Sequence, residues 1–421
     1  MSEWIEKKLT DLGGLGRGKS KHRPRDASHL YGGVYPFIQT GDIKAANHKI
    51  YSYSQTYSEA GLAQSKLWPK GTICITIAAN IADSAMLTFP ACFPDSVLGF
   101  IPDQEECEGE FIEYLLQYYQ KEIKTHSIGS VQENINLGTF DKVFFKIPSL
   151  PTQKAIAEIL SSLDDKIELN NQINQNLEAL AQALFKQWFM DFEFPNENGE
   201  PYKSSGGEMV DSELGEIPKG WEVINLGEVF EFTSGFPFKS EDFKEDGIYR
   251  IVTIRNVQDG AFVQKTENGI DSIPSKMGHQ IKLKEGDVIV SLTGNVGRTC
   301  FVTGKNYLLN QRVLKIEPIR NKELTSFPYF FFRRPELQQH LISISKGTAQ
   351  LNLSPVEMKN IKIPFQKEFS NHLFQKLQAL FDLEIETTKE SQQLSDLRDT
   401  LLPKLISGEL EVSEVNLEPT F

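Results

Sequence analysis

The chain has few cysteines, and their arrangement suits neither a disulfide nor a zinc ion. Its 421 residues include four, unevenly placed and without a CxxC pair: Cys74, Cys92, Cys107 and Cys300. This usage is typical of thiols in a reducing cytoplasm. We expect no disulfide and no metal site.

Long apolar runs and catalytic motifs are also missing. No stretch of about 18 apolar residues is present, so we expect no membrane span. The start Met1-Ser2-Glu3-Trp4 lacks the basic and then apolar pattern of a secretory signal, which favours a cytoplasmic location. The seven histidines have no metal-ligand spacing, and neither HExxH nor an Asn-Pro-Pro-aromatic motif for amino methylation occurs. We expect a protein that is not an enzyme and needs no cofactor.

The net charge of −13 argues at first sight against DNA, but the charge is unevenly distributed. Residues 1–150 carry 15 basic and 17 acidic side chains, and residues 218–364 carry 20 and 16. Residues 151–217 carry 4 and 13, and residues 365–421 carry 5 and 11. Because counterion release depends on the local charge at the DNA face, this distribution permits DNA binding. The acidic segments should face solvent or a protein partner.

What the sequence does contain is one module twice, at an offset of about 217 residues. Equivalent pairs include Trp4 and Trp221, Gly71 and Gly286, Asn80 and Asn295, Gln132 and Gln350, and Pro148 and Pro364. The offset is far longer than the roughly 20–50 residues of a solenoid repeat. We therefore predict one globular unit followed by one long helix, used twice. Such a chain suits a target with two halves, and bipartite DNA is the commonest such target.

Each globular unit is predicted to be α+β, with a twisted and largely antiparallel sheet. Residues 71–78 and 287–292 have the two-residue period of strands. The run Ile248–Val257 lies between two Asp-Gly turn signals and is predicted to be a strand. Short helices are expected at Glu110–Lys121 and Phe327–Phe332, the same place in each copy.

The segments after Pro148 and Pro364 are predicted to be long helices that form a coiled coil. Residues 151–189 contain no glycine and no proline after Pro151, and their apolar residues recur at steps of four and three. The expected pairing residues are Ile156, Leu160, Leu163, Leu177 and Leu184 on one helix, and Leu373, Leu377, Leu380, Leu394 and Leu401 on the other. A lone amphipathic helix of about 36 residues is unstable in water, and pairing within one chain is favoured by effective concentration.

If a two-fold axis perpendicular to the helices relates the copies, the helix pair is antiparallel. Asn170 and Asn174 would then meet Glu384, Thr387 and Ser391 at the centre of the seam and fix the register. The alternative is that each helix packs on its own globular unit.

These patterns predict domains at residues 1–150 and 218–364, helices at 151–192 and 365–410, a turn-rich linker at 193–217 and a short acidic tail at 411–421. The fold class is thus α+β, with two pseudo-two-fold-related β-rich domains separated by a pair of long antiparallel coiled-coil helices.

Several motifs resemble those of Type I restriction–modification specificity subunits. Residues 150–160 (LPTQKAIAEIL), 163–167 (LDDKI) and 184–189 (LFKQWF) resemble the central conserved helix of that family, and residues 397–409 (LRDTLLPKLISGE) resemble the end of its distal conserved helix. Residues 36–43 (PFIQTGDI) and 234–238 (SGFPF) resemble its target-recognition domains. The resemblance covers essentially the whole chain, in order.

This resemblance implies a non-catalytic subunit. Two target-recognition domains would each read one half of a split site in double-stranded DNA. The conserved helices would space the domains and dock two methyltransferase subunits, which would methylate an adenine in each half-site. Restriction motor–nuclease subunits would complete the complex.

Residues 13–20 (GGLGRGKS) match the phosphate-loop pattern GxxxxGK[ST], but their surroundings argue against a nucleotide site. A phosphate loop needs a buried apolar strand before it and a helix after it. Here the preceding segment is short and polar, and the following one contains Pro24. We predict instead a glycine loop that lies against DNA phosphates or reads guanine, through alternating basic residues: Arg17, Lys19, Lys21, Arg23 and Arg25. Solvated surface is the alternative.

Further candidate DNA contacts are spread over both copies. Basic candidates in the second copy are Lys239, Arg255, Arg298, Arg312 and Lys346, and Thr40 comes from the first. Equivalent polar candidates are Ser130, Gln132 and Asn134 in the first copy, and Thr348, Gln350 and Asn352 in the second. Asn and Gln form bidentate bonds with adenine, although they also cap helices and turns. Asn80 and Asn295 follow strands, as turn residues or DNA contacts.

Two other classes stay open from the residues alone. One is an enzyme, either a nucleotide hydrolase or a nuclease. The other is a coiled-coil scaffold that does not bind DNA, and salt-dependent binding to duplex DNA separates it from a DNA-recognition subunit.

Overall fold

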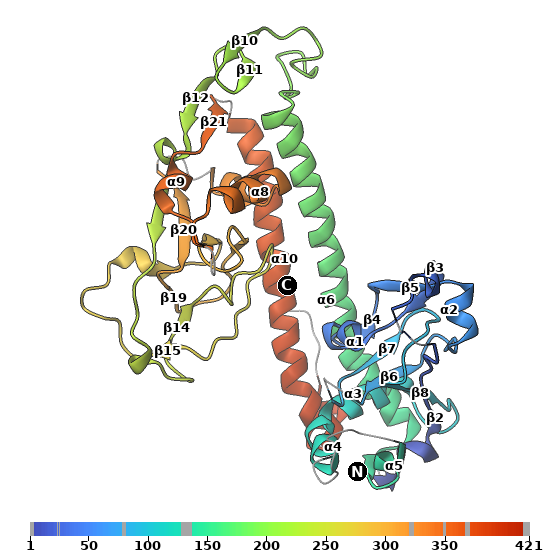
Figure 1. The fold of residues 1–421 in the computed structure, drawn as a ribbon. Helices are drawn as coiled ribbons and strands as arrows, with labels where there is room; N and C mark the ends of the chain where they lie inside the picture. Colours follow the sequence, from blue (N-terminus) through green and yellow to red (C-terminus); the bar gives the residue numbers. More distant parts are fainter. Residues whose placement is uncertain are drawn as a thin grey trace. The chain divides into compact units, whose positions relative to one another are not determined.

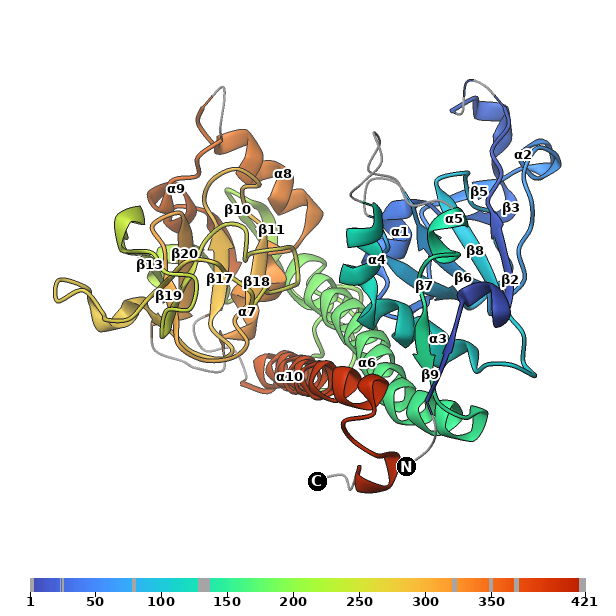
Figure 2. The same ribbon diagram turned by 90° about the horizontal axis from the view of Figure 1, so that it is seen from below.

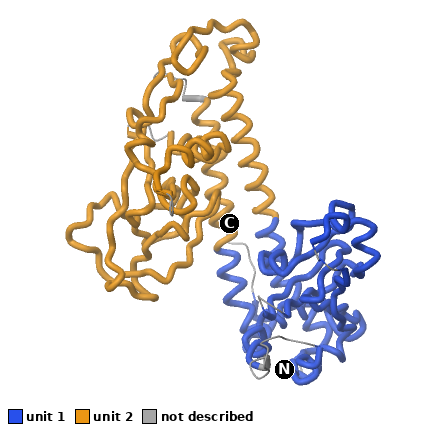
Figure 3. The backbone as a smooth tube through the Cα atoms, in the orientation of Figure 1, with its two compact units in different colours: residues 1–168, 393–421 blue, residues 169–392 orange. Residues whose placement is uncertain are grey.

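The computed structural model describes residues 4–22, 24, 26–77, 81–127, 137–319, 324–347, 351–366 and 371–415. The chain forms two compact units (Figure 3). Unit 1 consists of Met1–Glu168 and Gln393–Phe421, and unit 2 of Leu169–Gln392. Each unit therefore contains a globular part and a segment of both long helices, α6 (Leu150–Phe185) and α10 (Asn371–Ser407). None of the helices in the described parts of the chain is long and apolar enough to cross a membrane.

The globular part of unit 1 is built on a five-stranded sheet with the order β2-β8-β6-β7-β4 (Figure 1). These strands are β2 (Gly13–Arg17), β4 (Lys49–Ile50), β6 (Ile73–Thr76), β7 (Ser84–Leu87) and β8 (Val97–Pro102). Smaller pairs join β1 (Ile5–Lys7) to β9 (Phe145–Ile147) and β3 (Tyr31–Phe37) to β5 (Gln55–Tyr57). The helices are α1 (Thr40–Ala45), α2 (Glu59–Ala63), α3 (Gly109–Tyr118), α4 (Gln120–Ser127) and α5 (Leu137–Phe140).

Unit 2 contains two four-stranded sheets, with the orders β13-β20-β17-β18 and β15-β14-β19-β16. The first has β13 (Phe230–Ser234), β17 (Val288–Ser291), β18 (Thr299–Phe301) and β20 (Val313–Pro318). The second has β14 (Tyr249–Val252), β15 (Gly269–Ile270), β16 (Lys282–Leu283) and β19 (Tyr307–Leu309). β12 (Glu222–Asn225) pairs with β21 (Lys362–Phe365), and the helices are α7 (Ser326–Phe332), α8 (Pro335–Ile344) and α9 (Pro355–Lys359).

The two globular parts share one topology, as the repeat in the sequence predicts. The order β2-β8-β6-β7 in unit 1 recurs as β13-β20-β17-β18 in unit 2, and the pair β1-β9 recurs as β12-β21. The order of α3, α4 and α5 along the chain recurs as α7, α8 and α9. The α+β fold class and the duplicated module are therefore confirmed.

The strands β6 and β17 are each buried on both faces, because their successive side chains pack into two different cores. In β6, Ile73 and Ile75 pack into the core that contains α3, whereas Cys74 packs with Trp68 on the opposite face. In β17, Val288 and Val290 join the core that contains α7, and Ile289 faces the second sheet. The two-residue period of these strands thus separates two apolar cores.

Both long helices pack against the globular part of each unit and against each other. In unit 1, Ile156 and Leu160 of α6 share a core with Leu405 of α10 and with the residues of α3. In unit 2, the rings of Phe185 of α6 and Phe374 of α10 both pack against the ring of Phe327 of α7. Within each unit, higher residue numbers on α6 meet lower ones on α10, so the paired segments are antiparallel. The alternative in which each helix packs on its own globular unit describes only part of this packing.

One buried hydrogen bond recurs at the same place in both units. Tyr114 of α3 donates to Asp164 of α6 over 2.6 Å, and Tyr329 of α7 donates to Glu384 of α10 over 2.8 Å. α3 and α7 each lie between a sheet and the long helices (Figure 2). Each Tyr–carboxylate pair also has an arginine beside it. Arg398 forms an ion pair with Asp164, and Arg333 donates a hydrogen bond to the hydroxyl of Tyr329. Each globular part is therefore fixed to its helix segments by a directional polar contact.

The structure corrects three details of the predicted elements. The strand predicted over Ile248–Val257 is limited to β14, and residues 253–257 form a turn held by the side chain of Asn256. The helix predicted over Glu110–Lys121 is divided between α3 and α4. Residues 193–217 contain the strand β10 (Met209–Ser212), which pairs with β11 (Gly215–Pro218), and Phe194 stacks between Tyr202 and Trp221.

The polar centre of the helix seam also differs in part from the prediction. Asn170 donates to Glu390 over 2.7 Å, and Asn174 donates to Thr388 over 3.1 Å and accepts from Thr387. Glu384 does not meet these asparagines, because its carboxylate accepts a hydrogen bond from the buried hydroxyl of Tyr329. Ser391 donates to the carbonyl of Thr387 in its own helix.

Replacing Asn170 and Asn174 by leucine should raise the melting temperature of unit 2 by a few degrees, because apolar burial replaces an incompletely bonded amide. The Oδ1 atom of Asn170 is buried and has no hydrogen-bond partner among the described residues. The same change should loosen the register, since buried asparagines specify it. Calorimetry gives the first readout, and the gap in the methylated DNA motif gives the second. Unchanged melting with an unchanged gap would count against this role.

Candidate nucleic-acid interface

In unit 2, two of the predicted DNA-contact residues lie together in a polar hollow of about 360 Å³. Arg312 and Asn352 line it with Thr293, Gln311 and Leu351. Backbone bridges join Asn352 to Thr293 and to Lys346, and the amide of Leu292 donates to the carbonyl of Arg312 over 2.9 Å. Three chain segments that are distant in sequence are thus held by backbone bonds, so the hollow is formed without a ligand.

The chemistry of this hollow matches the edges of base pairs. A guanidinium, two primary amides and a hydroxyl supply both donors and acceptors, and Leu351 adds an apolar surface. Arginine forms bidentate bonds with guanine, asparagine and glutamine do so with adenine, and apolar groups contact the thymine methyl. The alternative in which Asn352 caps the next helix is wrong, because Ser354 caps α9 through the amide of Val356.

Asn295 and Arg298 lie in the turn between β17 and β18, and they bind each other and the protein. Arg298 donates to the side chain of Gln258, and the amide of Asn295 accepts from Arg298 at 3.0 Å when its oxygen faces the guanidinium. The carbonyl of Asn295 also accepts from Ser291. These contacts fix the shape of the turn that carries Thr293.

The other basic candidates of unit 2 are exposed at scattered positions. Lys239 pairs with Glu241 and Lys346 with Glu357, each at 3.0 Å, and Arg255 is exposed in the turn after β14. Exposed ion pairs of this kind contribute about 0–1 kcal/mol, so a DNA phosphate can replace the carboxylate at little cost.

The glycine-rich segment of unit 1 is not the loop that the sequence predicts. Gly13–Arg17 form the strand β2, which pairs with β8. A Cβ atom on Gly16 would lie 3.0 Å from Trp68, and one on Gly18 would lie 2.6 Å from Phe93. Gly16 and Gly18 are therefore required because this segment packs closely on aromatic side chains. A strand here also disagrees with a phosphate loop, in which the glycines would cradle a nucleotide.

The basic residues of this segment are only partly described. Arg17 is exposed at the end of β2 and donates to the carbonyl of Asp95 over 2.5 Å. Lys19 and Lys21 are exposed, and Gln64 holds the backbone amide of Lys21 at 2.6 Å. Thr40 is the half-buried first residue of α1. Outside the described residues lie Arg23, Arg25, Asn80, Ser130, Gln132, Asn134, Thr348 and Gln350.

Sequence reasoning missed Thr293, Gln311 and Leu351. Gln311 directly precedes Arg312, and Thr293 follows the buried strand β17 by two residues. Their positions next to strand ends could have indicated that they belong to the site. Among the described residues, no group of three or more His, Cys, Asp and Glu side chains could hold a metal ion. The four cysteines are buried free thiols.

The two globular parts share one topology and pack on the same two helices. One of them also has a polar hollow. These features define a recognition protein with a duplicated module. The family model described as "Type I restriction modification DNA specificity domain" matches residues 1–179 and again residues 218–394, and the chain belongs to this family. It carries the DNA specificity domain twice and is not itself catalytic.

Named relatives match most of this chain. The chain is 29% identical to the Type I restriction enzyme MjaIX specificity subunit of Methanocaldococcus jannaschii, over 98% of this chain and 95% of the relative. It is 28% identical to the Type I restriction enzyme HindI specificity subunit of Haemophilus influenzae, over 65% of this chain and 72% of the relative. A solved S subunit of a Type I restriction-modification system from M. genitalium shares the fold, with a TM-score of 0.58, 19% identity and coverage of 96% of both chains.

Proposed function

We propose that this chain reads a split site in double-stranded DNA. The domain at residues 1–150 would read one half-site and the domain at residues 218–364 the other. The helices at 151–192 and 365–410 would set the distance between the half-sites. The observation that carries this proposal is the repetition of one fold in both units, with a buried Tyr–carboxylate bond from α3 to α6 in unit 1 and from α7 to α10 in unit 2.

Base readout in the second half-site would come from the polar hollow of unit 2. Arg312, Gln311 and Asn352 supply the bidentate groups, and Thr293 adds a hydroxyl. Lys239, Arg255 and Lys346 would contact phosphates, as Arg17, Lys19 and Lys21 would in unit 1.

The long helices would dock two methyltransferase subunits, with restriction motor–nuclease subunits joining the assembly. Leu180 on α6 and Leu397 on α10 occupy equivalent positions in the repeat, at an offset of 217. Both are exposed, at 50% and 40%. Leucines on two long helices that stay open to solvent indicate a protein contact, and their equivalence favours two identical partners.

Alanine at Arg312 and Asn352 together should relax the half-site read by unit 2, because each lost bidentate contact removes about 1–3 kcal/mol of base discrimination. The measurement is adenine-methylation mapping in a host that produces this chain with its methyltransferase partner. The wild-type chain should give a split motif, and the double variant should give the same motif with degenerate bases in one half only.

Lys219→Ala is the matched control, because Lys219 is an exposed basic residue of unit 2 that pairs with Glu208, away from the hollow. It should leave both half-sites unchanged. A double variant that altered both half-sites, or neither, would contradict the assignment of this hollow to base readout.

A further inference from the structure

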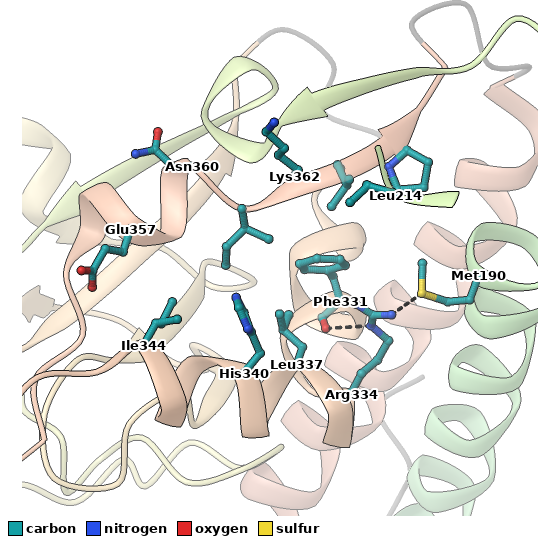
Figure 4. Close-up of a pocket in the computed structure, with 13 residues that line it drawn as sticks. Met190, Leu214, Phe331, Arg334, Leu337, His340, Ile344, Glu357, Asn360 and Lys362 are labelled. Carbon is teal, nitrogen blue, oxygen red and sulfur yellow. Dashed lines mark hydrogen bonds between the residues drawn. The ribbon is translucent and has the colours of Figure 1, made fainter. Parts of the chain in front are cut away.

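Unit 2 contains a second hollow, of about 560 Å³, whose lining is mostly apolar (Figure 4). Leu337, His340 and Ile344 of α8 form one side of it. The opposite side includes residues 360–364, at the end of α9 and the start of β21, with Leu214 of the β10-β11 turn. The hollow is separate in its lining residues from the polar hollow that we assign to DNA. Its volume is in the range of ligand sites, roughly 300–1,000 Å³.

Arg334 places a cation in the wall of this apolar hollow. Its Nε atom donates to the carbonyl of Phe331 over 3.3 Å and a terminal nitrogen contacts the sulfur of Met190 (Figure 4). The guanidinium also lies over the Phe331 ring, 4.5 Å from its centre. Among the described residues, no carboxylate is within ion-pair distance of Arg334. Burial lowers its pKa from the ordinary value, and Glu336 offsets this in part.

Two other charged residues of the wall have ion-pair partners. Lys362 pairs with Glu213 at 2.5 Å, and Oε1 of Glu357 pairs with Lys346 at 3.0 Å, while Oε2 of Glu357 is buried without a hydrogen-bond partner among the described residues. A guanidinium that has free donors in a partly desolvated setting favours a carboxylate, which it binds with two parallel hydrogen bonds. Arg334 is therefore the cation of this wall that lacks a carboxylate partner among the described residues.

The surroundings favour an extended occupant over a small molecule. Leu214, which lines the hollow, is a large apolar side chain that is 46% exposed, and Val356 is exposed on α9 next to the lining residue Glu357. Exposed apolar surface at the rim of a hollow is typical of a contact with a protein segment.

We propose that this hollow docks a short apolar segment of a partner protein that carries one side-chain carboxylate. The carboxylate would bind Arg334, with His340 as a further donor on the same side. Apolar side chains of the segment would cover Leu337 and Ile344. None of the residues that line this hollow is assigned to DNA, so a failure of this proposal would leave the proposed DNA recognition untouched.

The test uses the full chain and titration calorimetry with capped tetrapeptides that have Glu at the third position and Leu, Ile or Phe elsewhere. At least one peptide should bind saturably, and its Gln counterpart should bind roughly tenfold more weakly or worse, because a charge-assisted hydrogen-bond pair is lost. Arg334→Met should bind both peptides with the same weak affinity. Lys244→Met, an exposed cation of unit 2 paired with Asp271, is the control and should match the wild type.

Ile344→Ser supplies an independent variant of the apolar wall, and it should weaken both peptides by the same factor while keeping the preference for Glu. Absence of saturable binding, equal affinity for Glu and Gln peptides, or an unchanged Glu preference in Arg334→Met would overturn the proposal. Acetate that binds as tightly as the peptide would also overturn it, because the site would then take small carboxylates.

Discussion

Replacing Arg398 by alanine is expected to destabilise unit 1 by about 3–5 kcal/mol, because it leaves a buried carboxylate without its cation. Arg398 of α10 contacts Asp164 of α6 at 2.5 Å, and their exposed fractions are 9% and 8%. Burial alone would lower the pKa of Arg398, but Asp164 and Asp399 beside it raise the pKa. The other oxygen of Asp164 accepts from Tyr114, so the change also weakens the bond that fixes α3 to the helix.

Hydrogen exchange in β6 and β8 during urea titration measures this loss locally in unit 1. Asp399→Asn is the matched control, because Asp399 binds the same guanidinium but is exposed, and it should cost at most about 1 kcal/mol. A cost for Arg398→Ala as small as that of the control would show that water solvates Asp164 and that the pair does not fix the helices.

Replacing Glu384 by glutamine is expected to stabilise unit 2 by about 3 kcal/mol at pH 8 and by less than about 1 kcal/mol at pH 5. Glu384 is 6% exposed, and burial, followed by the nearby Glu178, raises its pKa from 4.5 to about 7. Tyr329 donates to one oxygen, and the other has no hydrogen-bond partner among the described residues. Arg333 opposes the shift but is shared with Glu178 and Asp259.

The direction follows from proton linkage. Between pH 4.5 and 7 the folded state holds a proton on Glu384 that the unfolded state has released, so unit 2 loses stability as the pH rises through this range. Glutamine stays neutral and can still accept from Tyr329, which removes this slope. Melting curves at pH 5 and pH 8 measure the difference, with Glu386→Gln as the control on an exposed part of α10. Equal melting of wild type and Glu384→Gln at pH 8 would contradict a buried, partly protonated carboxyl.

The module and its helices could be predicted from the sequence because duplication and periodicity are repeated signals. Ile156, Leu160, Leu373 and Leu377 are all buried in the structure, and the order of strands is the same in both copies. The clusters around Tyr114 and Tyr329 could not be predicted, because each joins residues about 50 positions apart that no period relates. Glu384 shows the consequence: it has the spacing of a seam residue, yet it binds the globular part.

The candidate site was less predictable than the fold. Arg312 and Asn352 could be selected from side-chain chemistry, but their meeting with Thr293 depends on backbone bridges between three distant segments. Gly16 and Gly18 were mispredicted for a different reason. Their pattern fits a phosphate-contacting loop, but they are required because Trp68 and Phe93 occupy the space that a Cβ atom would take, and only the folded sheet reveals this.

The most direct test of the two-domain account shortens both helices and maps the methylated DNA motif. Deleting residues 166–172 from α6 and 390–396 from α10 removes one heptad from each helix and keeps Asp164, Arg398, Glu178 and Glu384 in place. Seven residues span about 10 Å of helix, so the gap should shorten by up to about three base pairs. Both half-sites should stay the same. A changed half-site with an unchanged gap would contradict the account.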